Sequence, residues 1–263
     1  MEEPQQVSEP QLSTPKPPAM SLPGRLLNIL AVPGDVFEQV KSSDPCAANW
    51  LAPALILIAL SWVGTWLIFS QDTFKHQVTE MTDKAIEKRI EKAHMSKEQA
   101  EQVRQAAGKW AGIGSTIGPA VGAVVVAFAT PFLWGLILWL VGVKALKGNF
   151  PYMKGVEVAG LAAIISALDA VVRTLLILLL GNLFASPSLA LLIKEFDPQN
   201  TTHSLLALMN VMTFWVLAVR ASGLARLSGA TFGKAAIWVF GIWAAYTGLF
   251  VGFGVAVQRV FAG

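Results

Sequence analysis

Long apolar runs are the feature that most constrains how this chain can fold. Five of them are long enough, or nearly so, to cross a bilayer, whose hydrocarbon core needs about 20 helical residues. They cover residues 50–70, 113–143, 156–182, 205–219 and 235–257. Charged residues make up 14% of the chain, whereas about 25% is usual in soluble domains. The sequence therefore predicts an all-α integral membrane protein, a bundle of about five transmembrane helices.

Two of the runs differ from a simple span. Residues 113–143 are too many for one straight crossing and too few for two, and they contain Pro119 and Pro131. We therefore expect a tilted or kinked helix there. Residues 205–219 are too few to span unless flanking residues extend the helix.

The segment before the first run predicts a tail and two surface helices. Residues 1–21 are rich in Pro, Gln and Ser, which is typical of a disordered tail, and residues 22–263 form the predicted membrane domain. Between residues 22 and 41, apolar residues recur at helical spacing on both sides of Pro33 and Gly34. This pattern predicts two short amphipathic helices that lie on the membrane surface.

Residues 71–112 are charged and predict a helical hairpin outside the membrane, inserted between the first two spans. Ser96 and Gln99 have the spacing of a capping box, which starts a second helix after a break at His94 and Met95. The hairpin is either a solvated structure or a docking site for a protein partner. His76 and His94 have no further ligands at metal-binding spacing, so no metal site is predicted.

Basic residues in the short loops predict the orientation, because such residues stay on the cytoplasmic side. The amino terminus is then cytoplasmic and the carboxyl terminus outside. Seven of these basic residues, together with Lys41, are expected to face anionic lipid headgroups, unless they only direct the insertion of the helices into the membrane. The short loops and the lack of eukaryotic targeting signals favour a bacterial inner membrane. The cations are Arg25, Lys144, Lys147, Lys154, Arg220, Arg226 and Lys234.

Small residues recur every fourth position in two of the predicted spans. Such stripes let helix backbones approach closely in lipid. The sequence leaves open whether the partner is another helix of the same chain or a second copy in a homodimer. The stripes are Gly114, Gly118 and Gly122, and Ala244, Gly248, Gly252 and Ala256.

Three ionisable residues fall within or next to the third run. Asp169 and Arg173 stand one helical turn apart on one face, and Glu157 lies near the start of the run. Charges at this depth are costly, so Asp169 and Arg173 are expected to face the bundle and each other. The pair is a structural strut, a substrate or ion site, or a contact with another protein.

The remaining composition argues against catalysis. The chain has no H-E-x-x-H, no G-x-S-x-G and no Gly-rich phosphate loop, and its single cysteine, Cys46, excludes an internal disulfide. We expect no enzyme activity, no cofactor and no nucleic-acid partner.

Three stretches together resemble the Yip domain family of polytopic membrane proteins, which includes Ypt/Rab-interacting proteins and bacterial relatives. The resemblance implies five spans and a cytoplasmic amino terminus. For eukaryotic members it also implies roles in membrane trafficking or small-GTPase partners. The third run lacks the early proline of the family pattern. The matching residues are Pro33, Phe37, Trp50 and Pro53, then Gly148, Phe150 and Gly155, then Trp215, Gly223, Gly229, Gly233 and Lys234.

The sequence thus favours a non-enzymatic integral membrane protein that binds lipid or protein partners. The alternative is a transporter or channel that uses Asp169, Arg173 and Glu157. A transport path requires these side chains and Asn210 to face one water-accessible cavity. A scaffold predicts a dry, closed ion pair instead.

Overall fold

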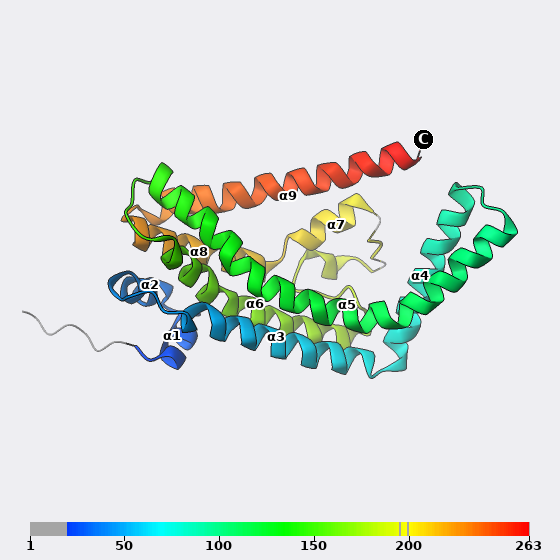
Figure 1. Cartoon of the computed structure of the whole chain (residues 1–263), viewed down its shortest axis with the longest axis horizontal. Helices are drawn as coiled ribbons and strands as arrows, with labels where there is room; N and C mark the ends of the chain where they lie inside the picture. The colour runs from blue at the N-terminus through cyan, green and yellow to red at the C-terminus, as the bar shows by residue number, and fades with distance from the viewer. Residues whose placement is uncertain (1–19, 195, 199, 263) are drawn as a thin grey trace, which may run out of the picture.

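The computed structural model describes residues 20–194, 196–198 and 200–262, so the predicted tail lies almost entirely outside the described residues. The described part is helical and contains no β-strand, which confirms the all-α prediction (Figure 1). The elements in chain order are α1 (Leu22–Asn28), α2 (Pro33–Ser42), α3 (Ala48–Phe69), α4 (Asp72–Lys92), α5 (Lys97–Leu140), the π-helix η1 (Val141–Ala145), α6 (Tyr152–Leu180), the 3-10 helix η2 (Leu189–Leu192), α7 (Thr201–Leu208), α8 (Val211–Ser228) and α9 (Phe232–Ala262).

Four helical segments are long and apolar enough to cross a membrane: Ala48–Phe69, Ile117–Ala145, Tyr152–Leu180 and Phe232–Gly254. The membrane protein prediction is confirmed, but residues 205–219 do not form one span. The chain breaks there at Met209 and Asn210, because the Asn210 side chain caps α8 by accepting from the backbone N–H groups of Met212 and Thr213. The predicted fourth span is therefore divided between α7 and α8, and neither helix is long and apolar enough to cross a membrane alone.

The charged hairpin consists of α4 and the first part of α5, and it projects from one end of the bundle (Figure 1). The capping box of Ser96 and Gln99 is present at the start of α5. A 2.6 Å hydrogen bond from Lys84 lowers the pKa of the Glu80 carboxyl, and both side chains are exposed. Because α5 continues from the hairpin into the membrane segment without interruption, residue 112 marks no boundary between helices.

The core forms where α3, α5 and α6 cross and where α8 and α2 cover α6. Small residues allow the crossing, because a side chain at Gly155 would lie 2.5 Å from the carbonyl oxygen of Gly135 on α5. A side chain at Gly160 would meet the backbone of Trp50 on α3 in the same way. The starting half of α6 is therefore enclosed by helices on several sides.

The apolar face of α2 lies inside this core and not on a lipid surface. Val36, Phe37 and Val40 are fully buried, and α2 packs mainly against α8. The amphipathic helix is therefore present, its apolar face meets protein and not lipid, and its position at the membrane surface stays a prediction. Its periodicity is correct, but amphipathic spacing does not distinguish a protein partner from a lipid one.

The two stripes of small residues face open space within this chain. An added side chain at Gly114, Gly118 or Gly122 on α5 would meet no atom within 4 Å, and the same holds for Gly248 and Gly252 on α9. Ala244 and Ala256 are exposed. These positions do not pack against another helix of the same chain, so a contact with a second copy stays a prediction.

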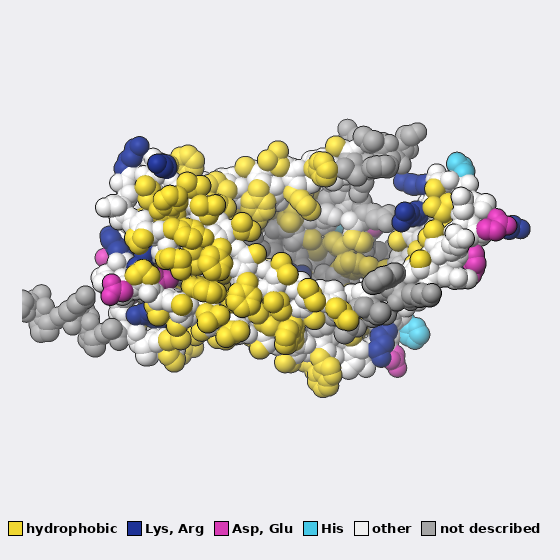
Figure 2. Space-filling model, in the orientation of Figure 1, with side chains coloured by type: hydrophobic (Ala, Val, Ile, Leu, Met, Phe, Trp, Pro, Cys, Tyr) yellow, Lys and Arg dark blue, Asp and Glu magenta, His cyan; other side chains and the backbone are white. Residues whose placement is uncertain are grey.

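Charge and hydrophobicity divide the molecule along its long axis. Figure 2 shows apolar side chains over the middle of this face and charged side chains at its two ends. One end carries the hairpin. The other end carries α1, α2, residues 144–154 and the turn between α8 and α9, and is called the polar end below.

Candidate functional site

A buried hydrogen-bonded network joins three helices at the polar end. Lys154 and Glu157 lie three residues apart in the first turns of α6, with Nζ and Oε1 3.0 Å apart. Glu157 Oε2 accepts a hydrogen bond from Asn49 at the start of α3, and Asn49 Oδ1 accepts one from Arg25 of α1 at 3.1 Å. Lys154 Nζ also lies 3.5 Å from Ser43 Oγ.

This network is structural in its geometry. Glu157 and Asn49 are fully buried and Lys154 is almost so. Buried charges are tolerated where each has a partner, and here a single acid meets a single base and an amide. The arrangement ties α1 and α3 to α6, and none of its side chains lines any of the three cavities described below. Asn49, the central link, was not identified from the sequence, although a polar residue just before an apolar run is a usable signal.

A second buried cation lies on α8. Arg220 is 5% exposed, and its guanidinium carbon stands 4.3 Å from the centre of the Trp134 ring of α5. Stacking of this kind stabilises a cation that lacks water. The prediction that Lys154 and Arg220 face lipid is therefore wrong, because both are enclosed by neighbouring helices.

The other predicted basic residues lie nearer the surface of the polar end. Arg25 is half-buried through its bond to Asn49. The exposed cations come from three separate segments and are called the basic rim. They are Lys41 from α2, Lys144 and Lys147 from the segment after α5, and Arg226 and Lys234 from the region around the α8–α9 turn.

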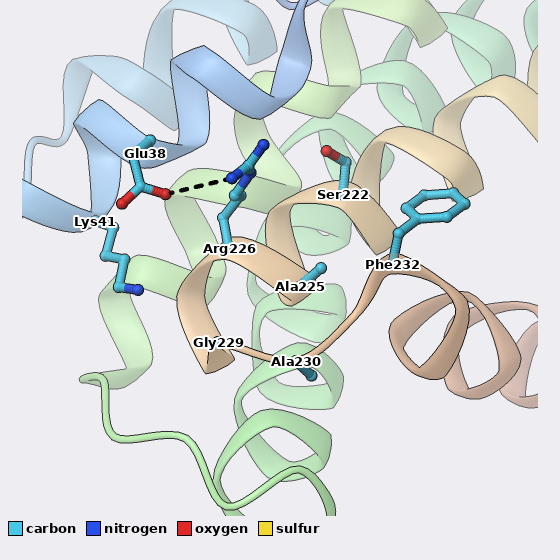
Figure 3. A pocket seen from close by; sticks show the side chains of 8 residues that line it. All are labelled: Glu38, Lys41, Ser222, Ala225, Arg226, Gly229, Ala230 and Phe232. Carbon is cyan, nitrogen blue, oxygen red and sulfur yellow. Dashed lines mark ion pairs between the residues drawn. The ribbon is translucent and has the colours of Figure 1, made fainter.

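A cleft of about 350 Å³ opens within this rim between α2 and the end of α8 (Figure 3). Glu38 and Arg226 face each other across it, with Oε2 and Nη1 3.9 Å apart. Lys41 lies beside them, and Phe232 stands at the edge where α9 begins. The left-handed conformation of Gly229, with φ of 73°, ends α8 and turns the chain along the cleft. Two cations and one carboxylate can together hold a small anionic group.

The intramembrane pair occupies a different place. Asp169 Oδ2 and Arg173 Nη2 are 3.5 Å apart on α6, and their side chains are 22% and 49% exposed. The pair is therefore not closed off by the protein on all sides, and whether its open side meets water or lipid decides between a transport site and a strut. Arg173 and Asn210 line one cavity of about 550 Å³, whereas Glu157 belongs to the buried network at the polar end. The structure thus brings together two of the four predicted transport residues in that cavity.

Metal binding finds no support in the described part of the chain. No group of three His, Cys, Asp or Glu side chains there could hold a metal ion.

Comparison with known proteins gives one match. The family model of the Yip1 domain matches residues 27–253, which include the hairpin, the polar end except most of α1, and the cavity beside Arg173. No curated protein and no solved structure matches the chain.

Proposed function

We propose that this chain, which belongs to the Yip1 domain family, is a non-enzymatic integral membrane protein whose polar end binds anionic lipid headgroups. The observation that carries the proposal is the basic rim. Its five cations come from segments far apart in sequence and are brought to one end of the bundle by the fold. Packing of α2 against α8 and of α8 against α9 holds the segments that present Lys41, Arg226 and Lys234.

Electrostatics support this assignment. A cation near an anionic membrane surface contributes about 1 kcal/mol to lipid binding. The cleft between Glu38 and Arg226 adds a place where one phosphate group could displace a loose ion pair, since 3.9 Å is long for a charge-assisted hydrogen bond. Asp35, Glu38 and Asp44 are exposed nearby and reduce the net positive charge, so affinity depends on the whole rim.

Removing part of the basic rim is expected to weaken binding of anionic lipid by about tenfold to a hundredfold. The variant is Lys144→Gln/Lys147→Gln/Lys234→Gln, and native mass spectrometry of the full chain titrated with phosphatidylglycerol gives the affinity. Phosphatidylcholine, which carries no net charge, should bind equally to both proteins.

The matched control removes three exposed cations from the hairpin at the other end, Lys92→Gln/Lys97→Gln/Arg104→Gln. This control should keep the affinity of the unchanged protein for phosphatidylglycerol. If both triple variants lose affinity equally, net charge and not the basic rim determines binding, and the proposal fails.

We also propose that the polar end is cytoplasmic and that the carboxyl end of α9 is outside, in a bacterial inner membrane. In a Cys46→Ser background, Lys144→Cys should react with a membrane-impermeant maleimide only after the cells are opened. Lys92→Cys in the hairpin should react in intact spheroplasts. The reverse pattern would invert the orientation and place the basic rim away from the cytoplasmic leaflet.

A protein partner is the second candidate, favoured by a groove in the hairpin. The groove, of about 580 Å³, lies between α4 and α5 and is lined by apolar side chains that include Val78, Met81, Ile86 and Val103. Apolar surface in an otherwise charged hairpin is typical of a docking site for another helix. A small GTPase, which the family resemblance implies for eukaryotic members, is cytoplasmic and would therefore meet the polar end and not this hairpin.

Transport has less support, because the predicted path is divided. Glu157 is closed into the network with Lys154 and Asn49, and Arg173 faces another cavity.

A further inference from the structure

We infer that the cavity beside Arg173 binds the anionic head of a single membrane amphiphile, with Arg173 as the charged anchor and the apolar tail in the surrounding lipid. This site, called the lateral cavity, is separate from the basic rim. The inference does not depend on the lipid binding proposed for the basic rim. It lies between α6, α7, α8 and α9, and its polar lining consists of Arg173, Asn210, Thr213, Trp243, Tyr246 and Thr247.

The lateral cavity is open toward lipid because α9 leaves the bundle. Near its start α9 is packed against α8, with Ala235 and Val239 buried. Further along, Tyr246 is 50% and Phe250 79% exposed, although both line the cavity. An amphiphile can therefore enter sideways from the bilayer, and a volume of about 550 Å³ accommodates a head group and the first part of a chain.

The polar lining is rich in hydrogen-bond donors. Asn210 uses its Oδ1 to accept from the backbone N–H groups of Met212 and Thr213, which leaves its amide nitrogen as a donor. A guanidinium has five N–H donors, and the 3.5 Å contact with Asp169 involves one terminal nitrogen of Arg173. The hydroxyl of Tyr246 and the indole N–H of Trp243 add further donors. Such a set suits an acceptor-rich anion, either a carboxylate or a phosphate.

The break between α7 and α8 also favours an anionic ligand in the lateral cavity. The amino end of α8, with its cap Asn210, lies at the lateral cavity. The first turn of a helix carries partial positive charge, and half-helices that begin within a membrane commonly direct that charge at an anionic group. The charge of Arg173 and the dipole of α8 therefore act in the same direction.

Asp169 restrains Arg173 and opposes the ligand. It stands one turn before Arg173 on α6 and is not among the described residues that line the lateral cavity. Its carboxylate lowers the net charge that a bound anion experiences. Removing this charge with Asp169→Asn should tighten binding, whereas removing the charge of Arg173 should weaken it at least tenfold.

Photo-crosslinking on the full-length protein in detergent micelles tests the site. The probes are palmitate and phosphatidate, each with a diazirine on the acyl chain, and the labelled peptides are identified by mass spectrometry. We expect saturable labelling of peptides that contain residues 207–213 and 243–251. Arg173→Gln should raise the probe concentration for half-maximal labelling at least tenfold.

Further variants separate binding from folding. Asp169→Asn/Arg173→Gln leaves no stranded charge and should also lose labelling, whereas the Lys144, Lys147 and Lys234 triple variant should keep it. Tyr246→Phe, which removes one donor without changing volume, should weaken labelling by a few fold.

The competing outcomes are distinct. If palmitate labels and phosphatidate does not, the source of the anion is a fatty acid; the opposite result assigns a phospholipid, and both support the inference. Suppression by inorganic phosphate at the concentration of the probe itself would show that the tail contributes nothing and would overturn it. Equal labelling by a phosphatidylcholine probe, or labelling unchanged in Asp169→Asn/Arg173→Gln, would overturn it as well.

Discussion

Gly155→Ala is expected to destabilise the protein by about 3 kcal/mol, the upper end of the usual cost of overpacking a core. The added methyl group would lie 2.5 Å from the carbonyl oxygen of Gly135, and a backbone atom in a crossing helix cannot rotate away. For a chain of this size the loss corresponds to a fall in melting temperature of about 6–12 °C. Thermal unfolding of the purified protein in detergent measures it.

The same substitution at an open glycine serves as the control. Gly118 on α5 and Gly248 on α9 have no atom within 4 Å of the added methyl group. Alanine there should keep the melting temperature or raise it slightly, because alanine favours helix by up to about 1 kcal/mol over glycine. A fall of similar size at Gly155 and Gly118 would mean that the crossing of α5 and α6 is not where close packing matters.

Glu157→Leu is expected to cost about 3–5 kcal/mol, since it leaves Lys154 as a buried charge without its acid. Lys154→Met should cost a similar amount for the converse reason. The double variant should recover a large part of the loss, because apolar side chains of similar volume need no partner. Unfolding of all four proteins in detergent gives a double-mutant cycle.

The recovery in the double variant is the decisive result. Additive losses would indicate that the two side chains act independently and that the bonds to Asn49 and Ser43 dominate. Lys84→Met in the hairpin is a suitable control. It removes an exposed ion pair with Glu80 that water and salt screen, and should leave the unfolding transition unchanged.

Much of the architecture follows from hydropathy, because a bilayer requires long apolar helices. The apolar runs at 50–70, 156–182 and 235–257 each correspond to one spanning helix. The capping box at Ser96 was predictable because its hydrogen bonds are local in sequence.

The burial of Lys154 and Arg220 was not predictable, because loop charge gives orientation without saying which cation a neighbouring helix covers. The division of the predicted fourth span also depends on one side chain, since Asn210 can either face a partner within a helix or cap a new one.

The glycines at which the helices cross were not predicted as packing residues, for a similar reason. The regular stripes on α5 and α9 are evident in sequence but open in the fold, whereas the crossing uses Gly135, Gly155 and Gly160, which follow no single four-residue repeat. Small residues show where a helix can be approached, not which helix approaches it. Gly155 and Ala159 do share one face of α6, and that shorter pattern was the available signal.

The continuity of α5 has a mechanical consequence. A helix of 44 residues at about 1.5 Å per residue forms a rod of about 66 Å that reaches from the hairpin through the bilayer. Its far end is pinned to α6 at Gly135, just before the basic rim. A force on the hairpin is therefore transmitted along α5 toward the opposite membrane face, and Pro119 and Pro131, which lack an N–H donor, each remove one backbone hydrogen bond from that helix.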